Sequence, residues 1–567
     1  MVNHPEWKLP LANSYVEKWA GEAPERVALI QHEEGRSLTY SQFNAMIDLF
    51  ALKLLAMGIR KGDRVGTMLL LFPEHLALMY ACFKVGAIIA PLDVRLKEGE
   101  VIRDLGKIKP KAFFFHGKTP VRDFREVGRA VQQNCPYVEH LVQLTPTSQR
   151  DDILEGALNF VEEFDGARLL ALRNDRQLTT LLADVYSSLD TRSAALIIFT
   201  TGTTGEPKPA VLCHENIIVQ NEVLARGIGL RGENMRFVCN MPCSHVAGTS
   251  EGPMTTFYVG GTAILLRIFD PRMTLDAAQK WKATALGMIP TQYRMIWNLP
   301  EYKDYDLSSL RLAIYAGASV DVQFLQELSK MAPYFGTGLG MTENAGFATF
   351  TPRGISVEEM AGQVGRAFPD VAQVTVRKPM NADGTAGEEL PDGEIGEICY
   401  HPPIVFLGYY DQPEETTKVI SKEGILYTGD MGYFKDLGSY RALYLAGRRK
   451  FMVKQKGYNV FPDEVAAHIG THPKVALAEV VGAPHRLFDE GIIAFVQPRP
   501  GTNLTGEEIM AYCRDIASYK RPQHVVIWPE DRPWPLSRTG KVNKIQLMEL
   551  AKKVIEDLRK EGKWDAQ

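Results

Sequence analysis

The sequence predicts an α/β fold for most of the chain and a smaller α+β unit at its C-terminal end. Short apolar runs alternate with amphipathic stretches, as in residues 64–71, 74–84 and 86–91, and this alternation favours α/β architecture. The 567 residues exceed the size at which a single hydrophobic core stops growing, so two or more domains are expected.

The boundary between the two units is expected near Lys450. The pattern after this residue is that of a shorter unit, and the three cations at 448–450 form a polar run in which a hinge is physically reasonable. We therefore assign residues 1–449 to a large N-terminal domain and residues 450–567 to a small C-terminal domain. The C-terminal elements are expected to be a helix from Pro462, strands at 475–481 and 491–497, a helix from Thr505 and a strand at 524–528.

One N-terminal helix is clear from its periodicity. From about Ser41 to Met57 apolar residues recur on one face, which we interpret as core, and Gly58 follows as the residue that would end the helix. The stretch 145–190 is polar and irregular in sequence, and we interpret it as an insertion or a subdomain linker outside the catalytic region. Thr505 and Glu508 have the spacing of a capping box at the start of the helix that is expected from Thr505.

Composition argues against several classes of function. The formal net charge of −4, with acids and bases interspersed, gives no basic footprint for nucleic acid. No run approaches the ~18 apolar residues of a transmembrane segment, and the first residues lack the apolar part of a signal peptide, so a cytoplasmic protein is expected. The seven cysteines do not suggest a disulfide framework, and Cys239 and Cys243 lack a second pair at zinc spacing, so core thiols are expected.

The most informative segment is a loop that combines hydroxyls, glycines and one cation. The preceding run 194–199 is short and apolar, as expected for a buried strand that delivers the loop to the edge of a sheet. The loop offers threonine hydroxyls, glycines whose backbone N–H groups can turn inward, and the ammonium of Lys208, which together suit a polyphosphate. Its spacing is not that of a Walker A loop, and by itself it could be a plain surface loop.

This loop, Thr201-Gly202-Thr203-Thr204-Gly205 with Lys208, resembles the phosphate loop of the acyl-adenylate-forming superfamily. That superfamily includes acyl-CoA synthetases, the adenylation domains of peptide synthetases and beetle luciferases. Further segments resemble its motifs in the same order, so the resemblance covers nearly the whole chain. They are Met241 to Gly248, Ala316-Gly317-Ala318-Ser319, Gly340-Met341-Thr342-Glu343, Tyr427-Thr428-Gly429-Asp430, Gly447-Arg448-Arg449-Lys450, Lys456-Gly457-Tyr458-Asn459-Val460 and Ser537-Arg538-Thr539-Gly540-Lys541.

The resemblance implies a large N-terminal domain of stacked α/β subdomains and a small, mobile C-terminal α+β domain. It also implies an acid:CoA ligase, in which ATP activates a carboxylic acid as acyl-AMP and the acyl group then passes to the thiol of CoA. Two anions must meet in the first step, so cations are needed around the α-phosphate. Lys541 is the expected catalytic cation, since a flexible ammonium can follow moving charge. Without the motif, a surface lysine would be the simpler interpretation.

The resemblance further assigns a nucleotide and metal site. Glu343 is the expected Mg²⁺ carboxylate, with Thr204 as a second ligand, and both count as catalytic; a charge at a helix start is the alternative for Glu343. Asp430 is expected to bind the ribose hydroxyls, with Arg448 in support. The other expected nucleotide contacts are Thr201, Gly202, Thr203, Gly205, Lys208, Gly317, Ala318, Ser319, Gly338, Leu339, Gly340, Met341 and Thr342. Pro209, Ser244 and Leu339 depart from the family pattern, which has a glycine, an aromatic residue and commonly a tyrosine at these places.

The acid is expected to bind beside His245, which is also expected to be catalytic. By resemblance this histidine aligns with that of acyl-CoA synthetases, where amino-acid-activating domains carry an aspartate, so an amino acid is not the expected substrate; a core histidine is the alternative. The small neighbouring residues leave room for an apolar fatty, alicyclic or aromatic acid, although Glu251 would disfavour a plain aliphatic tail if it faced the pocket. The expected substrate contacts are His245, Val246, Gly248, Ser250, Gly317 and Gly340.

For the second half-reaction the resemblance implies a swing of the small domain about Lys450. The swing would remove Lys541 and bring Lys456 and Gly457 to CoA, although Gly457 could equally be a plain turn glycine. Few residues follow Lys541, so free CoA rather than a fused carrier domain is the expected acceptor. The alternatives are an adenylation enzyme that loads a separate carrier protein, a luciferase-like monooxygenase and a catalytically silent nucleotide-binding relative, and a homodimer is left open.

Overall fold

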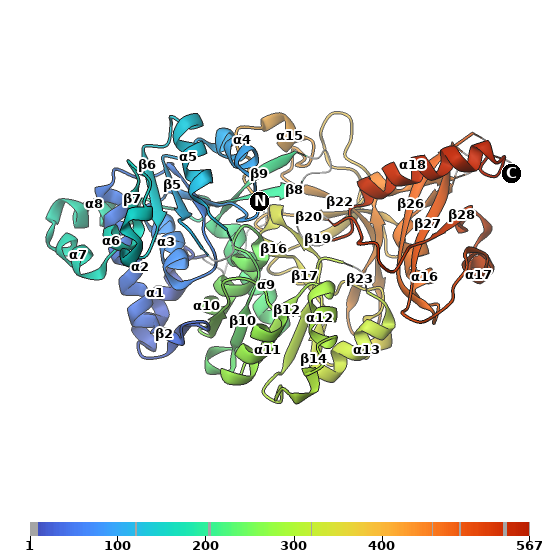
Figure 1. Ribbon diagram of the computed structural model, residues 1–567, viewed down its shortest axis with the longest axis horizontal. Helices are drawn as coiled ribbons and strands as arrows, with labels where there is room; N and C mark the ends of the chain where they lie inside the picture. Colours follow the sequence, from blue (N-terminus) through green and yellow to red (C-terminus); the bar gives the residue numbers. More distant parts are fainter. Residues whose placement is uncertain are drawn as a thin grey trace.

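Two large sheets with helices packed on them form most of the chain before residue 450 (Figure 1). The computed structural model describes residues 9–119, 122–201, 206–318, 320–455, 458–486, 489–536 and 541–565, and the structural statements below refer to these residues. The predicted architecture, a large α/β part followed by a smaller α+β part, is confirmed. The smaller part lies at the right-hand end of the molecule in Figure 1.

The first large sheet lies toward the left-hand end of Figure 1. Its strand order is β21 (Gly408–Tyr409), β9 (Pro207–Cys213), β8 (Ala194–Thr201), β4 (Ile88–Pro91), β3 (Arg64–Met68), β5 (Ala112–His116), β6 (His140–Leu144) and β7 (Leu158–Asn159). The strands from β8 to β7 pair in parallel, whereas β9 pairs antiparallel with both β8 and β21. Strands buried on both faces explain the continuous apolar runs in the sequence.

The second large sheet contributes the strand ends around which the site is built. Its strand order is β14 (Tyr334–Gly336), β13 (Leu312–Tyr315), β12 (Ala285–Met288), β10 (Arg236–Cys239), β11 (Thr262–Leu265), β1 (Val27–Gln31) and β2 (Arg36–Thr39). The pairs from β14 to β1 are parallel, and β1 and β2 form an antiparallel hairpin. The carboxyl ends of the parallel strands meet at one edge, where ligands bind in open α/β sheets.

Helices of very different lengths pack on the two sheets. The longer ones are α1 (Asn13–Glu22), α2 (Tyr40–Ala56), α3 (Pro73–Lys84), α4 (Glu98–Ile108), α5 (Arg125–Asn134), α8 (Arg176–Ser187), α9 (His214–Ile228), α11 (Pro271–Lys280), α12 (Pro290–Trp297) and α13 (Val322–Met331). The short ones are α6 (Phe160–Glu163), α7 (Gly166–Leu170), α10 (Thr255–Tyr258), α14 (Val357–Met360) and α15 (Pro413–Thr417). Among the described residues, none of the helices combines the length and apolarity needed to cross a bilayer.

An antiparallel sheet connects the large part of the chain to the C-terminal part. It runs β19 (Val374–Arg377), β20 (Gly396–Tyr400), β22 (Leu426–Asp436) and β23 (Arg441–Arg448). Two short antiparallel strand pairs precede it in the chain, β15 (Gly340–Met341) with β16 (Gly346–Phe347) and β17 (Thr349–Phe350) with β18 (Arg366–Ala367).

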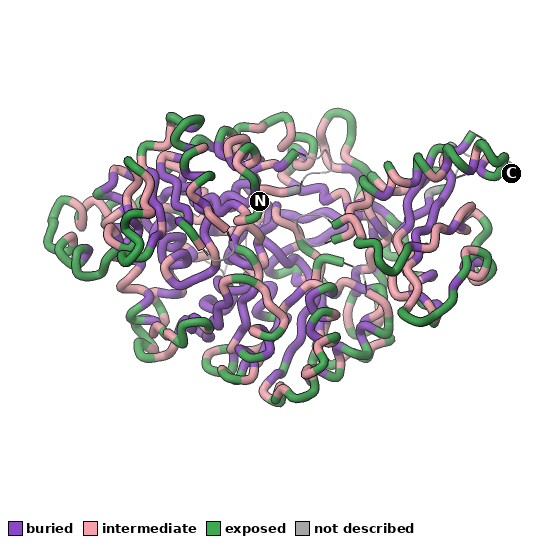
Figure 2. Tube along the Cα trace, in the orientation of Figure 1, coloured by how far each residue is buried: buried purple, intermediate pink, exposed green. Residues whose placement is uncertain are grey.

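The C-terminal unit has its own sheet, with buried strands inside and exposed segments outside (Figure 2). Its strands are β25 (Tyr458–Val460), β24 (Val453–Gln455), β27 (Asp489–Pro498), β26 (Val475–His485) and β28 (His524–Ile527). Its helices are α16 (Pro462–Gly470), α17 (Gly506–Tyr512) and α18 (Lys544–Lys560). The sheet carries two cores, one with residues of α16 and α17 and the other with residues of α18. Strand β23 ends at Arg448, and the next strand, β24, belongs to a different sheet. The chain therefore passes from one sheet to the other close to the predicted domain boundary, and the boundary itself stays a prediction.

Several local predictions can be checked against these elements. The helix predicted at 41–57 is α2, and Gly58 has the expected left-handed conformation with a φ of +77°. The stretch 145–190 contains α6 to α8 and the edge strand β7, elements that the sequence pattern did not predict, and its role as an insertion or linker stays a prediction. At α17 the Thr505 side chain accepts a hydrogen bond from the Glu508 N–H, but the Glu508 carboxylate pairs with Lys474.

Candidate active site

The site begins where the C-terminal unit reaches the N-terminal part. Lys541 lies shortly before α18, and its side chain passes over Gly317, the second residue after β13. A Cβ added to Gly317 would lie 3.1 Å from the Lys541 Cε and 3.5 Å from its Nζ. Gly317 also has a φ of +90°, which residues with side chains rarely adopt. Two motifs far apart in the sequence therefore meet here.

The Lys541 ammonium lies among other charged groups. Removal from water lowers its pKa and the nearby Arg448 lowers it further, whereas Asp430 and Glu251 oppose this shift. Opposite charges favour the ionised form, so the two carboxylates favour a cation at this place. The predicted site residues Lys541, Asp430 and Arg448 are thus brought together.

Asp430 and Arg448 are partners across neighbouring strands. Asp430 on β22 lies opposite Arg448 on β23, and the Arg448 Nε lies 2.6 Å from the Asp430 Oδ1. Burial raises the pKa of Asp430, and Arg448 and Lys541 counteract this rise. A buried carboxylate kept between two cations can accept hydrogen bonds from hydroxyl groups of a ligand.

Glu343 is held by an aromatic hydroxyl. It lies in the short turn η7 (Thr342–Asn344), it is buried, and its Oε1 accepts a hydrogen bond of 2.7 Å from the Tyr409 hydroxyl. Burial raises the pKa of Glu343, while the Tyr409 hydrogen bond and the cations Arg448 and Lys208 lower it. The carboxylate is therefore held by contact with Tyr409 and by the charges of Arg448 and Lys208.

Lys208 lies close to the same tyrosine. Its Nζ lies 2.6 Å from the Glu415 Oε2 and 5.1 Å from the centre of the Tyr409 ring. Sequence reasoning missed Tyr409 and Glu415. The signal that could have found them is the pair of adjacent tyrosines at 409–410 followed by the acidic start of a short helix at 413–417, since aromatic and acidic side chains can together hold a neighbouring cation.

His245 is neutral and its tautomer is fixed. It precedes the 3₁₀ turn η4 (Val246–Gly248), and its Nδ1 accepts a hydrogen bond of 3.1 Å from the Ala247 N–H. Burial and then the charge of Lys541 lower the pKa of His245 to about 4. The ring proton therefore lies on Nε2, which can donate a hydrogen bond to a ligand.

Three predicted substrate residues are packed against protein. Val246 is buried in the main core, and a Cβ on Gly248 would lie 2.1 Å from the carbonyl oxygen of Pro242. The Ser250 hydroxyl donates a hydrogen bond of 2.5 Å to the carbonyl of Ala345. Contacts between these three residues and a substrate stay predictions.

The glycines of the predicted adenine segment are explained by close backbone packing. A Cβ on Gly338 would lie 2.1 Å from the Thr349 carbonyl oxygen, and one on Gly340 would lie 1.8 Å from that of Gly346. Leu339 is partly buried against the main core. These observations account for the glycine spacing without a ligand, so nucleotide contacts here stay predictions.

The structure describes some of the remaining predicted residues and not others. Ala318 is exposed, and Met341 and Thr342 are partly buried. Outside the described residues lie Gly202, Thr203, Thr204, Gly205, Ser319, Lys456 and Gly457, together with the side chain of Thr201. Lys450, the predicted hinge residue, is exposed in the short turn η8 (Arg449–Phe451) between β23 and β24.

Glu343 is the carboxylate that we test as a metal ligand. Within the described ranges, His, Cys, Asp and Glu side chains do not gather in groups of three or more that could bind a metal. Glu343 fits Mg²⁺ nevertheless, because Mg²⁺ is usually bound through one or two protein oxygens and takes its other ligands from water and substrate phosphates.

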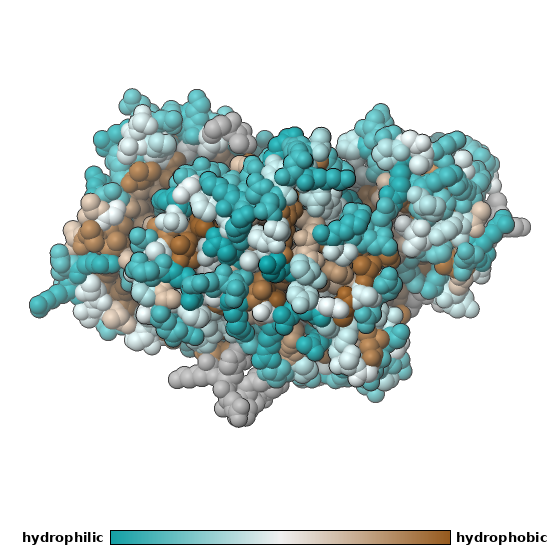
Figure 3. Space-filling model, turned by 90° about the horizontal axis from the view of Figure 1, so that it is seen from below, coloured by the Kyte–Doolittle hydropathy of each residue, from teal (hydrophilic) through white to brown (hydrophobic). Residues whose placement is uncertain are grey.

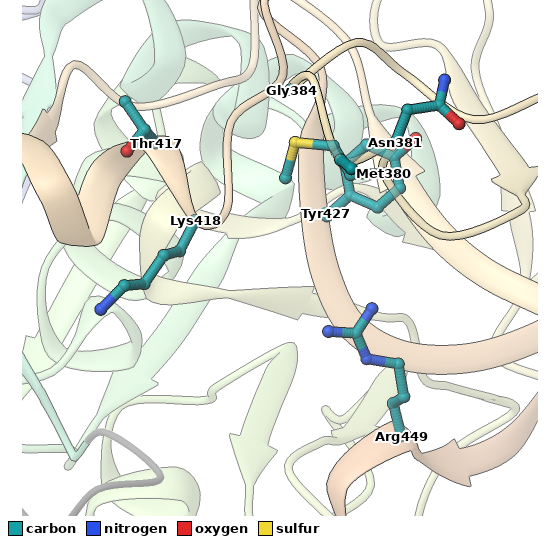
Figure 4. Close-up of a pocket in the computed structure, with 8 residues that line it drawn as sticks. Met380, Asn381, Gly384, Thr417, Lys418, Tyr427 and Arg449 are labelled. Atoms are coloured by element: carbon teal, nitrogen blue, oxygen red, sulfur yellow. The ribbon is translucent and has the colours of Figure 1, made fainter.

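A cavity of about 300 Å³ lies beside the predicted hinge, away from Lys541. Figure 4 shows Met380, Asn381 and Tyr427 on one side, Lys418 on the other and Arg449 below. Both cations already have partners, since Lys418 pairs with Glu415 and the Arg449 Nη1 lies 2.8 Å from the Glu397 Oε2. We therefore do not include this cavity in the candidate site.

Comparison with known proteins now identifies the family. The family model described as "AMP-binding enzyme" matches residues 16–410, and the model described as "AMP-binding enzyme C-terminal domain" matches residues 464–541. The chain belongs to the AMP-binding enzyme family. The predicted membership is confirmed, and both matched regions contribute to the site around Lys541.

The relatives of this AMP-binding enzyme are named as ligases or synthetases. The medium-chain acyl-CoA ligase ACSF2, mitochondrial, of Homo sapiens is 29% identical over 547 residues, 94% of this chain and 86% of the relative. The putative acyl-CoA ligase YdaB of Bacillus subtilis is 30% identical over 514 residues, 90% of this chain and 93% of the relative.

Solved structures of the family share the fold. ATP-bound MatB from Rhodopseudomonas palustris matches with a TM-score of 0.77 at 25% identity, covering 96% of this chain and 100% of that chain. A fatty acyl CoA synthetase from Mycobacterium tuberculosis matches with a TM-score of 0.69 at 25% identity, covering 96% and 99%. The anthranilate CoA ligase AuaEII matches with a TM-score of 0.79 at 21% identity, covering 98% and 100%, which shows the fold alone.

Proposed function

We propose that this AMP-binding enzyme is an AMP-forming acid:CoA ligase. It converts a carboxylic acid and ATP to acyl-AMP and pyrophosphate, and then transfers the acyl group to the thiol of CoA with release of AMP. The observation that carries the proposal is the packing of Lys541 over Gly317, within the charge field of Asp430 and Arg448. The names of the relatives, acyl-CoA ligases and acyl-CoA synthetases, support the same reaction.

In the first half-reaction, the acid oxygen attacks the α-phosphorus of ATP and pyrophosphate leaves. Lys541 stabilises the negative charge that develops between the carboxylate and the α-phosphate, because its ammonium is in place before the reaction. Asp430 accepts hydrogen bonds from the ribose hydroxyls, and Arg448 orients Asp430. Lys208 and the loop residues Thr201, Gly202, Thr203 and Gly205 hold the outer phosphates. Adenine lies between residues 317–319 and residues 338–342.

Glu343 and Thr204 are the proposed protein ligands of Mg²⁺. When bound, Mg²⁺ neutralises charge on the phosphates and orients them. Tyr409 holds the Glu343 carboxylate through its hydrogen bond and thereby fixes the direction in which the metal would be bound. Burial raises the pKa of Glu343, and Tyr409, Arg448 and Lys208 act against this rise and so favour the ionised carboxylate.

The acid lies beside His245, whose Nε2 proton can orient a polar group of the reacting acid. Its body is mainly apolar, either fatty, alicyclic or aromatic. For the second half-reaction the C-terminal unit turns about Lys450, so that Lys541 leaves and Lys456 and Gly457 line the path of CoA. The CoA sulfur then attacks the acyl carbonyl and AMP leaves.

The test is acid-dependent ATP–pyrophosphate exchange with Mg²⁺ over a panel of fatty, alicyclic and aromatic acids and amino acids, followed by thioester formation with CoA. Exchange and thioester formation with one class of acid support the proposal. Exchange with transfer to a carrier protein and not to CoA would support the alternative adenylation enzyme. No exchange with any acid would support a catalytically silent nucleotide-binding relative.

The location and assembly of the protein are proposals of the same kind. A cytoplasmic location was expected from composition, whereas ACSF2 relatives are named as mitochondrial, so fractionation of the producing cells is the check. On the face shown in Figure 3, apolar residues lie in several patches with hydrophilic residues between them. A homodimer is tested by sedimentation of the purified protein.

A further inference from the structure

Glu251 is a charged residue at the candidate site that the proposed mechanism does not use. It lies in the π-helical turn η5 (Ser250–Met254), close after His245 in the chain. A Cβ added to Gly346 would lie 2.6 Å from the Glu251 Cγ and 2.7 Å from its Oε1. The carboxylate arm therefore lies directly on the backbone of Gly346, where any larger residue would displace it.

Glu251 lies between His245, beside which we propose that the acid binds, and the turn of Glu343, where we propose that MgATP binds. His245 is on the acid side, and Gly346 follows the Glu343 turn in the hairpin β15–β16. Lys541 acts electrostatically on both His245 and Glu251, so the three side chains share one region.

Glu251 has no hydrogen-bond or ion-pair partner within the part of the chain that the structure describes, and it is only partly buried between buried neighbours. Burial raises the pKa of its carboxyl to about 8, and Lys541 acts in the opposite direction. A carboxyl group removed from water without a hydrogen-bond partner is costly in either protonation state, which favours a ligand that supplies a partner.

Lys541, the cation that acts on Glu251 electrostatically, cannot serve it throughout the reaction. Under the proposed function, on which this inference rests, Lys541 neutralises the reacting carboxylate and phosphate, and then leaves with the C-terminal unit before thioester formation. A partner supplied by the substrate would be present in both half-reactions, because the acyl group stays in its pocket.

We infer that Glu251 selects an acid whose mainly apolar body carries one hydrogen-bond donor, a hydroxyl or amino group, away from the carboxylate. The side chain accepts a hydrogen bond from this group and so discriminates against the unsubstituted acid of the same size. A site built to pair a polar group rejects analogues that lack it, because the protein group is then left unpaired.

The experiment compares ATP–pyrophosphate exchange for matched acids, each with a terminal hydroxyl, a terminal amino group or neither, in straight-chain and aromatic series. The wild type should prefer a donor-bearing acid by about 10- to 100-fold in kcat/KM over its unsubstituted partner. Glu251→Leu should reverse this preference by gaining activity on the unsubstituted acid, a gain that a misfolded variant could not show. Glu251→Gln, which keeps an acceptor oxygen, should retain part of the preference for the hydroxy acid.

Glu233→Leu is the matched control, since Glu233 is an exposed glutamate in the short turn η3 (Gly232–Asn234). It should leave the ratio between donor-bearing and unsubstituted acids as in the wild type. Exchange with the same ratio in wild type and Glu251→Leu would overturn the inference alone. Absence of exchange with every acid would overturn the proposed function and this inference with it.

Discussion

At the residue scale, the charge of each functional group depends on one or two particular neighbours. Burial raises the pKa of Glu343. The hydrogen bond of 2.7 Å from the Tyr409 hydroxyl is the largest of the interactions that lower it again. His245 shows the opposite case, because burial and Lys541 both keep its ring neutral. Replacing a neighbour should therefore change pH dependence as well as rate.

Tyr409→Phe should move the acid limb of MgATP-dependent adenylation to higher pH. The change removes a hydrogen bond that lowers the pKa of Glu343, so the carboxylate form, which binds Mg²⁺, is lost at a higher pH than in the wild type. We expect kcat/KM for MgATP at neutral pH to fall about 10-fold, as for other residues that orient metal ligands. The profile is measured from pH 5 to 9 by pyrophosphate exchange. The matched control is Tyr410→Phe, and an equal shift in both variants would contradict the role of Tyr409.

Lys541→Ala should separate the two half-reactions. Adenylation should fall by about 100- to 1,000-fold because the developing charge loses its preorganised cation. Thioester formation from supplied acyl-AMP should be unchanged. Quenched-flow assays of each half-reaction provide the measurement, with Lys560→Ala on the exposed part of α18 as control. Equal loss of both half-reactions in Lys541→Ala would contradict the assignment.

At the element scale, helix α18 is fixed to the C-terminal sheet by a partly buried charge cluster. Lys544 on α18 pairs with Asp463 of α16, and its Nζ lies 3.7 Å from the Glu479 Oε2 of β26. Burial raises the pKa of Glu479 to about 7, Lys544 opposes this rise and Asp463 adds to it. The three elements are thus coupled through one ammonium group.

Lys544→Met should destabilise the C-terminal unit by about 3 kcal/mol at pH 8, because two carboxylates lose their shared cation. The deficit should be smaller at pH 5. Without Lys544 the folded-state pKa of Glu479 rises further above its unfolded value, so the folded state binds the proton more tightly and stability falls as the pH rises through this range. Hydrogen exchange of β26 amides at both pH values is the measurement, with Lys552→Met on the exposed face of α18 as control. A deficit independent of pH would contradict the coupling.

Much of the fold, and less of the site, could be predicted from the sequence. Helix α2 was found because its apolar period is strong, whereas α6 to α8 were missed because most of their residues are exposed and the capping residues Asn159, Asp165 and Asp175 look like loop residues. The meeting of Lys541 with Gly317 followed from motif resemblance and not from any local pattern. Tyr409 and Glu415 were missed because their roles arise only when β21 pairs with β9.

At the scale of the whole molecule, contacts between the two parts hold the C-terminal unit where Lys541 reaches the site. The Arg499 Nη2 after β27 donates a hydrogen bond to the Gln323 Oε1 on α13. The Asp463 Oδ2 of α16 lies 3.1 Å from a Cβ placed on Gly447 of β23. This arrangement is the one that the proposed first half-reaction requires.

A covalent link between residues 323 and 499 should preserve adenylation and stop thioester formation. In Gln323→Cys/Arg499→Cys, a short bismaleimide would join the two parts, and the native thiols should not compete because all seven are buried. We expect normal pyrophosphate exchange and at least about 10-fold slower transfer of acyl groups to CoA, since conformational steps commonly limit such reactions. A linker that can be cleaved should restore transfer on cleavage. Full transfer activity while crosslinked would contradict the proposed swing.

The burial of the cysteines has a chemical consequence for an enzyme that makes an activated acyl group. Cys243 lies two residues before His245, and burial raises the pKa of its thiol to about 12; the same cause raises that of Cys513 to about 11. Among the two forms of a cysteine, only the thiolate is an effective nucleophile, so we expect these protonated sulfurs to react poorly with a mixed anhydride. We therefore expect these thiols to escape acylation, which leaves the incoming thiol as the nucleophile that consumes the intermediate.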